Sequence, residues 1–158
     1  MIPNSPLDTN AELARVPRVL IADDNAQGVE LLEAYLAETD YEIQTAFDGQ
    51  ETLQKVRQWK PDLILLDIMM PKISGFEVCK QVRAQPENGD VPILMITALD
   101  QPADVDRAVE AGADDFLTKP VNKSELLLRA RSALKSRMYK EQLEKAIAYI
   151  EEVEKARP

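Results

Sequence analysis

Histidine is absent from the 158-residue sequence. Without an imidazole, the chain cannot carry out Ser-His-Asp or Cys-His catalysis, and most catalytic zinc sites are excluded as well. Any chemistry must therefore depend on carboxylates, hydroxyls, lysine and a hard metal ion.

Cysteine and long apolar runs are also scarce. The single cysteine, Cys79, excludes an intrachain disulfide and any multi-cysteine zinc or iron–sulfur site. Its spacing from Phe76 and Val82 in an expected helix favours burial over a redox role. No stretch approaches 18 apolar residues, and the first residues lack a basic-then-apolar signal pattern. We therefore expect a soluble, cytoplasmic protein that does not associate with membranes.

A broad basic surface is missing too. The net charge is −9, with residues 1–121 contributing −12 and residues 122–158 contributing +3. Nucleic-acid binding usually needs a basic face, and no helix-turn-helix segment follows the acidic body. Direct nucleic-acid binding is not expected, and the basic residues of the tail indicate a solvated face rather than a nucleic-acid contact. These residues are Arg129, Arg131, Lys135, Arg137 and Lys140.

Regular patterning begins after a proline-containing lead-in at residues 1–17, which we expect to be flexible. Five short apolar runs are predicted to form buried strands: 18–22, 42–46, 63–66, 93–97 and 115–118. Segments with helical periodicity separate them: 27–38, 49–58, 75–84 and 103–111. This alternation is typical of βαβ units and a parallel sheet.

Five such units predict an α/β fold of the flavodoxin-like (βα)5 type. This is a doubly wound parallel sheet with strand order 2-1-3-4-5 and an extended C-terminal helix. In such sheets, ligands bind outside the carboxyl ends of the strands, where the order reverses between strands 1 and 3.

Polar residues follow the ends of four predicted strands. Asp23 and Asp24 follow the first strand, Asp67 the third, Thr97 ends the fourth and Lys119 follows the fifth. Carboxylates this close cannot all stay ionised without a cation, and Mg²⁺ suits an oxygen-only site that also meets a phosphate. Together with the compact positive charge of Lys119, the set indicates phosphoryl chemistry.

Each of these residues also has a simpler explanation on its own. Asp24 could be only a helix N-cap, Asp67 a turn former, Thr97 an ordinary strand threonine and Lys119 a solvated charge. The joint placement at one edge of the sheet favours a common site.

These residues lie in stretches that resemble the receiver domain of bacterial two-component response regulators. The stretches are VLIADDN (19–25), PDLILLDIMMPKISGFEVCKQVR (61–83), VPILMITAL (91–99) and AGADDFLTKP (111–120). The resemblance covers about residues 17–136, and we place the receiver domain at residues 18–136.

The resemblance implies that Asp67 accepts a phosphoryl group from a phosphohistidine on a sensor histidine kinase or phosphotransfer protein. It also implies a Mg²⁺ cofactor bound by Asp24, Asp67 and the backbone carbonyl of Met69, with Asp23 acting through water. The chain would catalyse only its own phosphorylation and dephosphorylation, and would not be an enzyme in the ordinary sense.

Further roles implied by the resemblance concern the phosphoryl oxygens. Thr97 and the backbone N–H of Ala98 would bind them, Lys119 would pair with another, and the Lys119–Pro120 bond would be cis. Phe116 would turn inward as Thr97 moves toward the new charge, although a plain core aromatic remains the alternative.

Two apolar positions near the site lead to a hypothesis about signal lifetime. Met69 and Leu99 follow Asp67 and Thr97 by two residues, where the family varies and where the lifetime of the phosphoryl group is set. We expect them to shield the group without orienting a water, which gives a long-lived signal.

The last helix is predicted to begin at a capping box formed by Asn122 and Glu125, and no Gly or Pro follows before Pro158. Two apolar stripes run along it: Leu127, Ala130, Leu134 and Met138, then Leu143, Ala146, Ile150 and Val153. We expect residues 137–158 to extend this helix as a coiled-coil dimerisation segment or a linker to an output domain. A solvated, partly frayed helix is the alternative.

The expected output is therefore a change of conformation that controls a partner, a domain or a homodimer. The dimer would form through the last helix or through the face made by helix 103–111, strand 115–118 and the last helix. Two other functions stay open: a phosphorylation-independent interaction module, and an aspartyl-phosphate hydrolase. The hydrolase is disfavoured because Ile68 and Met69 follow Asp67, where those enzymes need a second aspartate.

Overall fold

The computed structural model describes residues 15–157, so most of the predicted flexible lead-in at 1–17 lies outside the described residues. Its last three residues are tied to the domain. Arg15 forms an ion pair with Asp62 at 2.6 Å, and the carbonyl of Pro17 accepts a hydrogen bond from the backbone N–H of Glu42.

The five strands have the predicted bounds: β1 (Arg18–Ala22), β2 (Glu42–Ala46), β3 (Leu63–Leu66), β4 (Ile93–Thr97) and β5 (Asp115–Thr118). They form one parallel sheet with the order β2-β1-β3-β4-β5, which confirms the predicted fold. The central strands are covered on both faces, so they are apolar throughout, as β3 with its sequence LILL illustrates.

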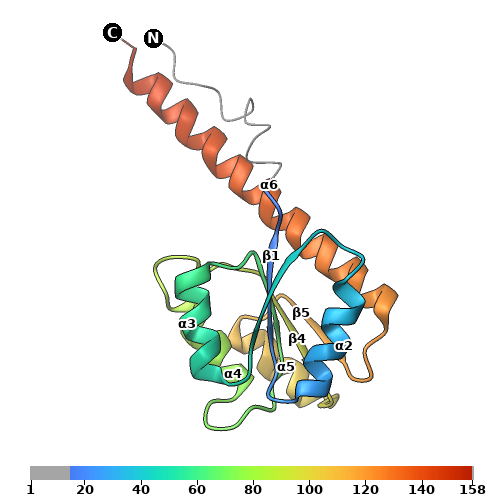
Figure 1. Cartoon of the computed structure of the whole chain (residues 1–158). Helices are drawn as coiled ribbons and strands as arrows, with labels where there is room; N and C mark the ends of the chain where they lie inside the picture. Colours follow the sequence, from blue (N-terminus) through green and yellow to red (C-terminus); the bar gives the residue numbers. More distant parts are fainter. Residues whose placement is uncertain (1–14, 158) are drawn as a thin grey trace.

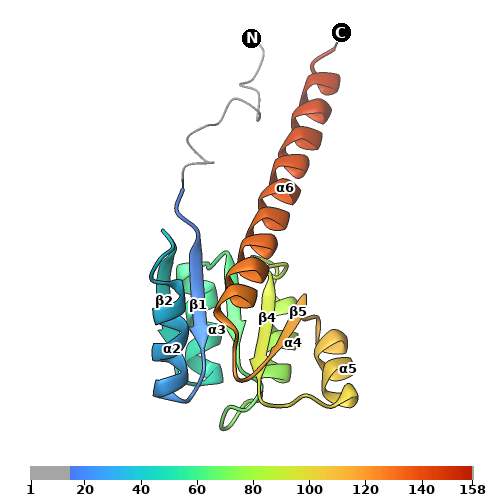
Figure 2. The same ribbon diagram turned by 90° about the vertical axis from the view of Figure 1, so that its right-hand side faces the viewer.

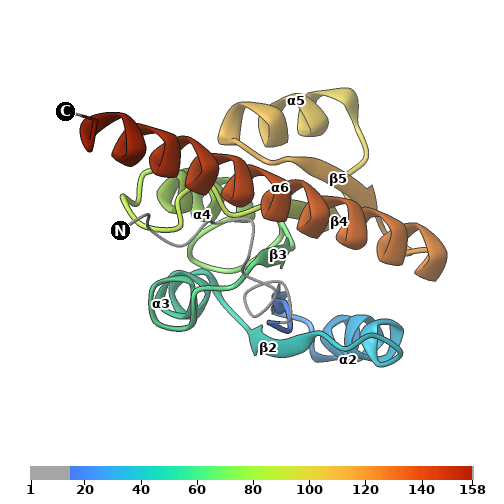
Figure 3. The same cartoon turned by 90° about the horizontal axis from the view of Figure 1, so that it is seen from above.

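Helices cover both faces of the sheet (Figure 1). One face carries α2 (Ala26–Leu36) and the first part of α6 (Lys123–Lys155), and the other carries α3 (Gly49–Trp59), α4 (Gly75–Arg83) and α5 (Pro102–Ala111). Figure 3 shows α6 crossing above the sheet between α5 and α2. Cys79 is fully buried in the α3–α5 layer, as expected, and Trp59 packs at the end of α3.

Helix ends differ from the sequence prediction by one or two residues. Helix α2 ends at Leu36 because both the backbone N–H and the hydroxyl of Thr39 donate to the Leu36 carbonyl, closing the chain into a turn. Helix α5 begins at Pro102, which lacks an N–H and is well suited to the first turn of a helix.

The last helix is continuous over 33 residues, and it begins where Asn122 accepts a hydrogen bond from the backbone N–H of Glu125. Its first turns pack on the sheet through Leu126 and Ala130, so Leu126 is buried more deeply than Leu127, the residue assigned to the stripe from sequence spacing. The helix then projects past the amino ends of the strands (Figure 2). Among residues 15–157, no helix combines the length and apolar character needed to cross a membrane.

Candidate functional site

Three carboxylates meet at the carboxyl edge of the sheet, next to the strand-order reversal between β1 and β3. Each of Asp23, Asp24 and Asp67 offers an oxygen, and these oxygens lie within 4.8 Å of one another. Asp23 and Asp67 are 2% and 6% exposed, whereas Asp24 is open to solvent. The arrangement has two buried acids and one accessible acid.

Lys119 bridges the two buried carboxylates. Its Nζ donates to Asp23 Oδ2 at 2.9 Å and to Asp67 Oδ2 at 3.2 Å. The strands bring these residues together: β1, β3 and β5 each end one residue before Asp23, Asp67 and Lys119. The ammonium group of Lys119 therefore neutralises part of the negative charge that the fold gathers at Asp23 and Asp67.

The environment shifts the pKa values of this pair. Burial raises the pKa of Asp67 and the negative charge of Asp23 adds to that, against the backbone N–H of Met69 and the ammonium of Lys119. Burial acts to lower the pKa of Lys119, but Asp23 and Asp67 outweigh it, so the pKa is raised. The site therefore favours the protonated form of Lys119 and stabilises the ionised form of Asp67 only in part.

Backbone groups fix the orientation of the acids. Asp23 Oδ1 accepts from the N–H of Asn25 at 2.9 Å, and Asp67 Oδ1 accepts from the N–H of Met69 at 3.1 Å. The second bond is a local turn of the kind suggested as the simpler explanation of Asp67. The N-cap of α2 is Asn25 and not Asp24, so the capping explanation of Asp24 is wrong.

The oxygen donors fit a hard divalent cation. Three carboxylates, no sulfur and one solvent-exposed member are suited to Mg²⁺, which retains several waters and takes few protein ligands. Both oxygens of Asp23 already accept protein hydrogen bonds. Both oxygens of Asp67 do so as well, so the solvent-exposed Asp24 is the carboxylate most open to a metal ion.

The remaining predicted residues surround the cluster at the same edge. Thr97 is fully buried at the end of β4, and its Oγ1 accepts from the N–H of Leu99 at 3.4 Å. Ala98 is exposed, and the Lys119–Pro120 peptide bond is cis. Phe116 is half-buried against the α3–α5 layer, beside Met95 in the register of β4 and β5.

The two apolar residues of the lifetime hypothesis differ in exposure. Met69 is 59% exposed, whereas Leu99 is half-buried against the core. Met69 is therefore the more accessible of the two positions.

Two glycines shape the site, and sequence reasoning did not assign either a role at it. A methyl group on Gly28 would lie 2.8 Å from Asp23 Oδ2, and one on Gly75 would lie 2.3 Å from the backbone oxygen of Asp67. Gly75 stands in the motif that follows Asp67, which could have suggested a close approach. Gly28 has only one signal, a glycine inside a helix, where it is normally unfavourable.

The sequence profile described as the response regulator receiver domain matches residues 19–131. The chain belongs to this family. Receiver domains are regulatory modules of two-component response regulators, and the acidic pocket described above corresponds to the place where the family binds Mg²⁺.

Named relatives of this receiver include full-length regulators. It is 42% identical over 120 residues to the DNA-binding dual master transcriptional regulator RpaA of Synechocystis sp., covering 76% of this chain and 50% of RpaA. It is 41% identical over 126 residues to the response regulator PleD of Caulobacter vibrioides, covering 80% of this chain and 28% of PleD. The chain thus spans half or less of the length of these two relatives.

Solved receivers have the same fold. A putative response regulator from Chloroflexus aurantiacus superposes with a TM-score of 0.74 at 36% identity, covering 77% of this chain and 99% of that one. The Vibrio cholerae chemotaxis protein CheY4 gives a TM-score of 0.71 at 34% identity, covering 75% and 99%.

Proposed function

We propose that this receiver takes a phosphoryl group onto Asp67 from a phosphohistidine of a sensor histidine kinase or phosphotransfer protein in the cytoplasm. The observation that carries the proposal is the Asp67 carboxylate, nearly buried yet paired at 3.2 Å with Lys119 inside a cluster of acids. In the transfer, an Asp67 oxygen bonds to phosphorus, the phosphorus–nitrogen bond breaks and the electron pair returns to the donor imidazole.

The residues around Asp67 supply charge and position. Lys119 already bonds Asp67, and we propose that it pairs with a phosphoryl oxygen as negative charge accumulates. Asp24, Asp67 and the carbonyl of Met69 would hold Mg²⁺, with Asp23 acting through water. The bound ion would neutralise the acids and the incoming phosphate.

We propose that three residues respond to phosphorylation of Asp67: Thr97, Ala98 and Phe116. Among residues 15–157, the buried Thr97 hydroxyl makes a single hydrogen bond, the 3.4 Å contact with the Leu99 N–H, so little hydrogen bonding opposes its movement toward a new anion. Ala98 is exposed at the rim of the site, and its backbone N–H is proposed to bind a phosphoryl oxygen. Phe116, half-buried in the same strand pair, would then move inward.

Intact mass measurement tests the phosphoacceptor. Incubation with Mg²⁺ and a small-molecule phosphodonor should give one stoichiometric adduct that is stable in acid and labile in base, and that is lost in Asp67→Asn. Turnover of the donor that does not depend on Asp67 would indicate a hydrolase. No adduct under any condition would indicate a phosphorylation-independent module.

The lifetime hypothesis has its own test. Leu99→Asn places a polar group beside Thr97, where it can orient a water for attack on phosphorus, and we expect faster dephosphorylation by about tenfold. The decay of the adduct by mass measures this. An unchanged decay rate would contradict a shielding role for Leu99.

A homodimer through α6 is the proposed output, either directly or by way of an output domain. Beyond the part that packs on the sheet, large apolar side chains are exposed, with Tyr139 and Leu143 at 61% and Ile150 at 55%. A repeating apolar stripe on a projecting helix needs a partner to be shielded from water. The face of α5, β5 and α6 is the alternative dimer surface.

Sedimentation of phosphorylated and unphosphorylated protein tests the α6 dimer. Ile150→Asp should shift the protein to monomer, while Ala148→Asp, an exposed position off the stripe, should not. Equal behaviour of the two variants would direct attention to the alternative face.

A further inference from the structure

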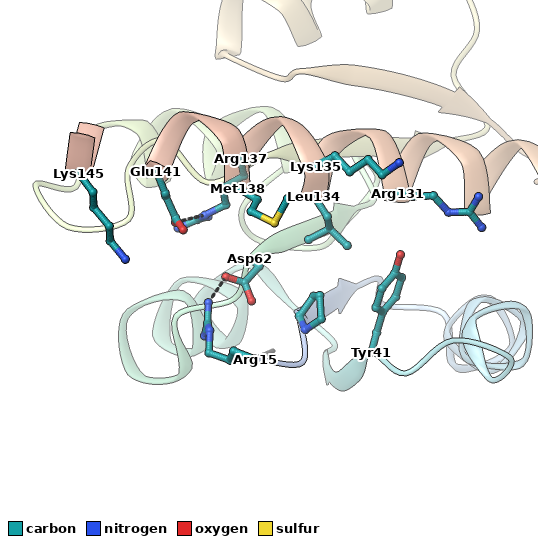
Figure 4. A pocket seen from close by; sticks show the side chains of 11 residues that line it. Arg15, Tyr41, Asp62, Arg131, Leu134, Lys135, Arg137, Met138, Glu141 and Lys145 are labelled. Carbon is teal, nitrogen blue, oxygen red and sulfur yellow. Dashed lines mark hydrogen bonds and ion pairs between the residues drawn. The ribbon is translucent and has the colours of Figure 1, made fainter. Parts of the chain in front are cut away.

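A cavity lies at the edge of the sheet opposite the carboxylate cluster, beneath α6 where that helix leaves the domain (Figure 4). Its volume is about 470 Å³. Figure 4 shows the side chains of α6 along one wall and those of Arg15, Tyr41 and Asp62 along the other. No residue of the phosphoacceptor site lines it.

The cavity combines an apolar floor with a basic rim. The apolar side chains are Pro17, Tyr41, Leu134 and Met138. The cationic ones are Arg15, Arg131, Lys135, Arg137 and Lys145, against two acids, Asp62 and Glu141. Such a site favours a ligand that carries both apolar side chains and negative charge.

The acids in the cavity are already paired. Asp62 binds Arg15 at 2.6 Å, and Glu141 binds Arg137 at 3.0 Å. By contrast, Arg131 and Lys135 form no hydrogen bond or ion pair with any residue in the range 15–157, and Arg131 acts only through its charge on Tyr41. Two cations at the rim therefore remain available to an occupant.

The wall opposite α6 is formed by the beginning of the described chain. Arg15 and Pro17 both line the cavity, and the ion pair with Asp62 holds Arg15 there. The residues that precede Arg15 therefore join the domain at the cavity rim. Four residues can span about 14 Å, enough to cross a cavity of this size.

We propose that this cavity binds residues 1–14 of the same chain, with their acids at the basic rim and their apolar side chains on the floor. The only charged side chains of this segment are Asp8 and Glu12, and it carries apolar residues at Leu7 and Leu13. A tethered segment also has a local concentration in the millimolar range, which a free ligand rarely reaches.

Occupancy would brace α6 at the point where it leaves the sheet. Leu134 and Met138 lie in the turns of α6 that face the cavity, directly before the projecting part of the helix. A segment packed between these turns and Tyr41 shields both from water. The first residues of the chain would thus control how firmly the projecting helix is held.

Charge exchange combined with amide hydrogen exchange tests the contact in the full chain. Reversing the acids (Asp8→Lys/Glu12→Lys) or the rim (Arg131→Glu/Lys135→Glu) should speed exchange at residues 134–145 by about threefold or more. Combining all four changes should bring the rates back toward those of the unmodified protein. The proposal would be overturned if neither double variant changed the exchange rates, or if the quadruple variant exchanged as fast as the double variants.

A matched control uses cations of another surface. Arg57→Glu/Lys80→Glu adds the same charge on the exposed faces of α3 and α4, away from the cavity. When combined with the reversed acids, this pair should not bring the exchange rates of residues 134–145 back toward those of the unmodified protein. Recovery with the control pair would show a general charge effect and would overturn the specific contact.

Engineered disulfides measure proximity independently of charge. Ala11→Cys paired with Met138→Cys, on the cavity floor, should form an intrachain disulfide with an effective concentration at least about tenfold above that of Ala11→Cys with Ser136→Cys, which lies off the cavity in the same turn. The native Cys79 does not interfere because it is buried and its pKa is raised to about 11. Equal values for the two pairs, or disulfides only between chains, would exclude the segment of the same chain as occupant.

Discussion

At the carboxyl edge of the sheet, Asp23 and Asp67 are nearly buried and both bind Lys119. At the amino edge, by contrast, Arg131 and Lys135 face an open cavity and have no acidic partner in the described part of the chain. The first edge is built by short turns directly after strands. The second is built by a helix and by the residues that precede β1, β2 and β3. Charges placed on tight turns are fixed by the backbone, whereas charges on long side chains of a helix can adapt. The edges should therefore respond differently to substitution.

The largest effect is expected for Gly75→Ala at the carboxyl edge. The added methyl group would lie 2.3 Å from the Asp67 carbonyl oxygen and 2.7 Å from Ile68 Cα, so backbone must move. We expect a loss of about 3 kcal/mol in the free energy of unfolding, measured in urea, and little or no phosphorylation.

Gly28→Ala is the comparison for that substitution. The three atoms nearest to its methyl group all belong to side chains, and the nearest is Asp23 Oδ2 at 2.8 Å. The carboxylate can yield only by weakening its bonds to Lys119 and to the N–H of Asn25, so the stability loss should be about 1–2 kcal/mol, smaller than for Gly75→Ala, while the phosphorylation rate falls. Equal stability losses for both glycines would contradict a carboxyl edge fixed by backbone.

At the amino edge, Arg137→Ala should cost about 1–2 kcal/mol of stability. The guanidinium is 16% exposed, binds the Asn88 side chain and donates to the Pro61 carbonyl at 3.5 Å. Its removal leaves the half-buried Asn88 side-chain oxygen and the Glu141 carboxylate without this donor, whereas the Pro61 carbonyl keeps its hydrogen bond from the Asn88 amide. Thermal unfolding measures the loss, and the phosphorylation rate should stay unchanged because the opposite edge is untouched. A strong fall in that rate would show that the two edges are coupled.

Asp67→Asn should make the protein more stable, by on the order of 1 kcal/mol at neutral pH without divalent cations, because it removes a buried like charge. The pKa of Asp67 is raised in the folded state. Its protonated form therefore favours folding, and that contribution is fully present below the unfolded pKa and is lost as pH rises through the folded pKa. The gain in stability of the variant over the unmodified protein should grow across this interval.

Magnesium provides the control for this prediction. Added Mg²⁺ should raise the melting temperature of the unmodified protein by mass action and have a smaller effect on Asp67→Asn. The same shift in both proteins would argue against Asp67 as a ligand.

The smallest effect is expected for Lys140→Ala. Its ion pair with Asp90 measures 3.2 Å, but both side chains are more than half exposed, so the change in stability should stay below about 0.5 kcal/mol. A loss as large as that of Arg137→Ala would show that the amino edge is less adaptable than its exposure indicates.

Sequence reasoning predicted the carboxyl edge far better than the amino edge. Buried parallel strands have apolar sequences, so all five strand bounds agreed with the structure. The charged site residues were located by their positions after strands, and Thr97 by its position at the end of one. The sequence pattern could not predict which of these side chains contact each other. The bond of Lys119 to Asp23 spans 96 residues, and the approach of Gly28 to Asp23 depends on the angle at which α2 leaves β1.

The amino-edge cavity carries no comparable sequence signal. It arises because Arg15, Tyr41 and Asp62 come from three separate segments and meet α6 only after the sheet has formed. No motif links them, and their charges look like ordinary surface charges in the sequence. The same holds for Leu126, whose burial depends on how α6 is rotated on the sheet.

Because α6 is one unbroken helix, a small tilt at its base moves its far end by a larger distance. From Leu134 to Lys155 the helix extends about 30 Å, so a tilt of about 5° where it rests on the sheet would displace its far end by nearly 3 Å. Changes too small to break any contact within the domain would be magnified into a displacement comparable to half a helical turn. Any molecule attached to the far end of α6 would therefore change position when the conformation of the domain changes.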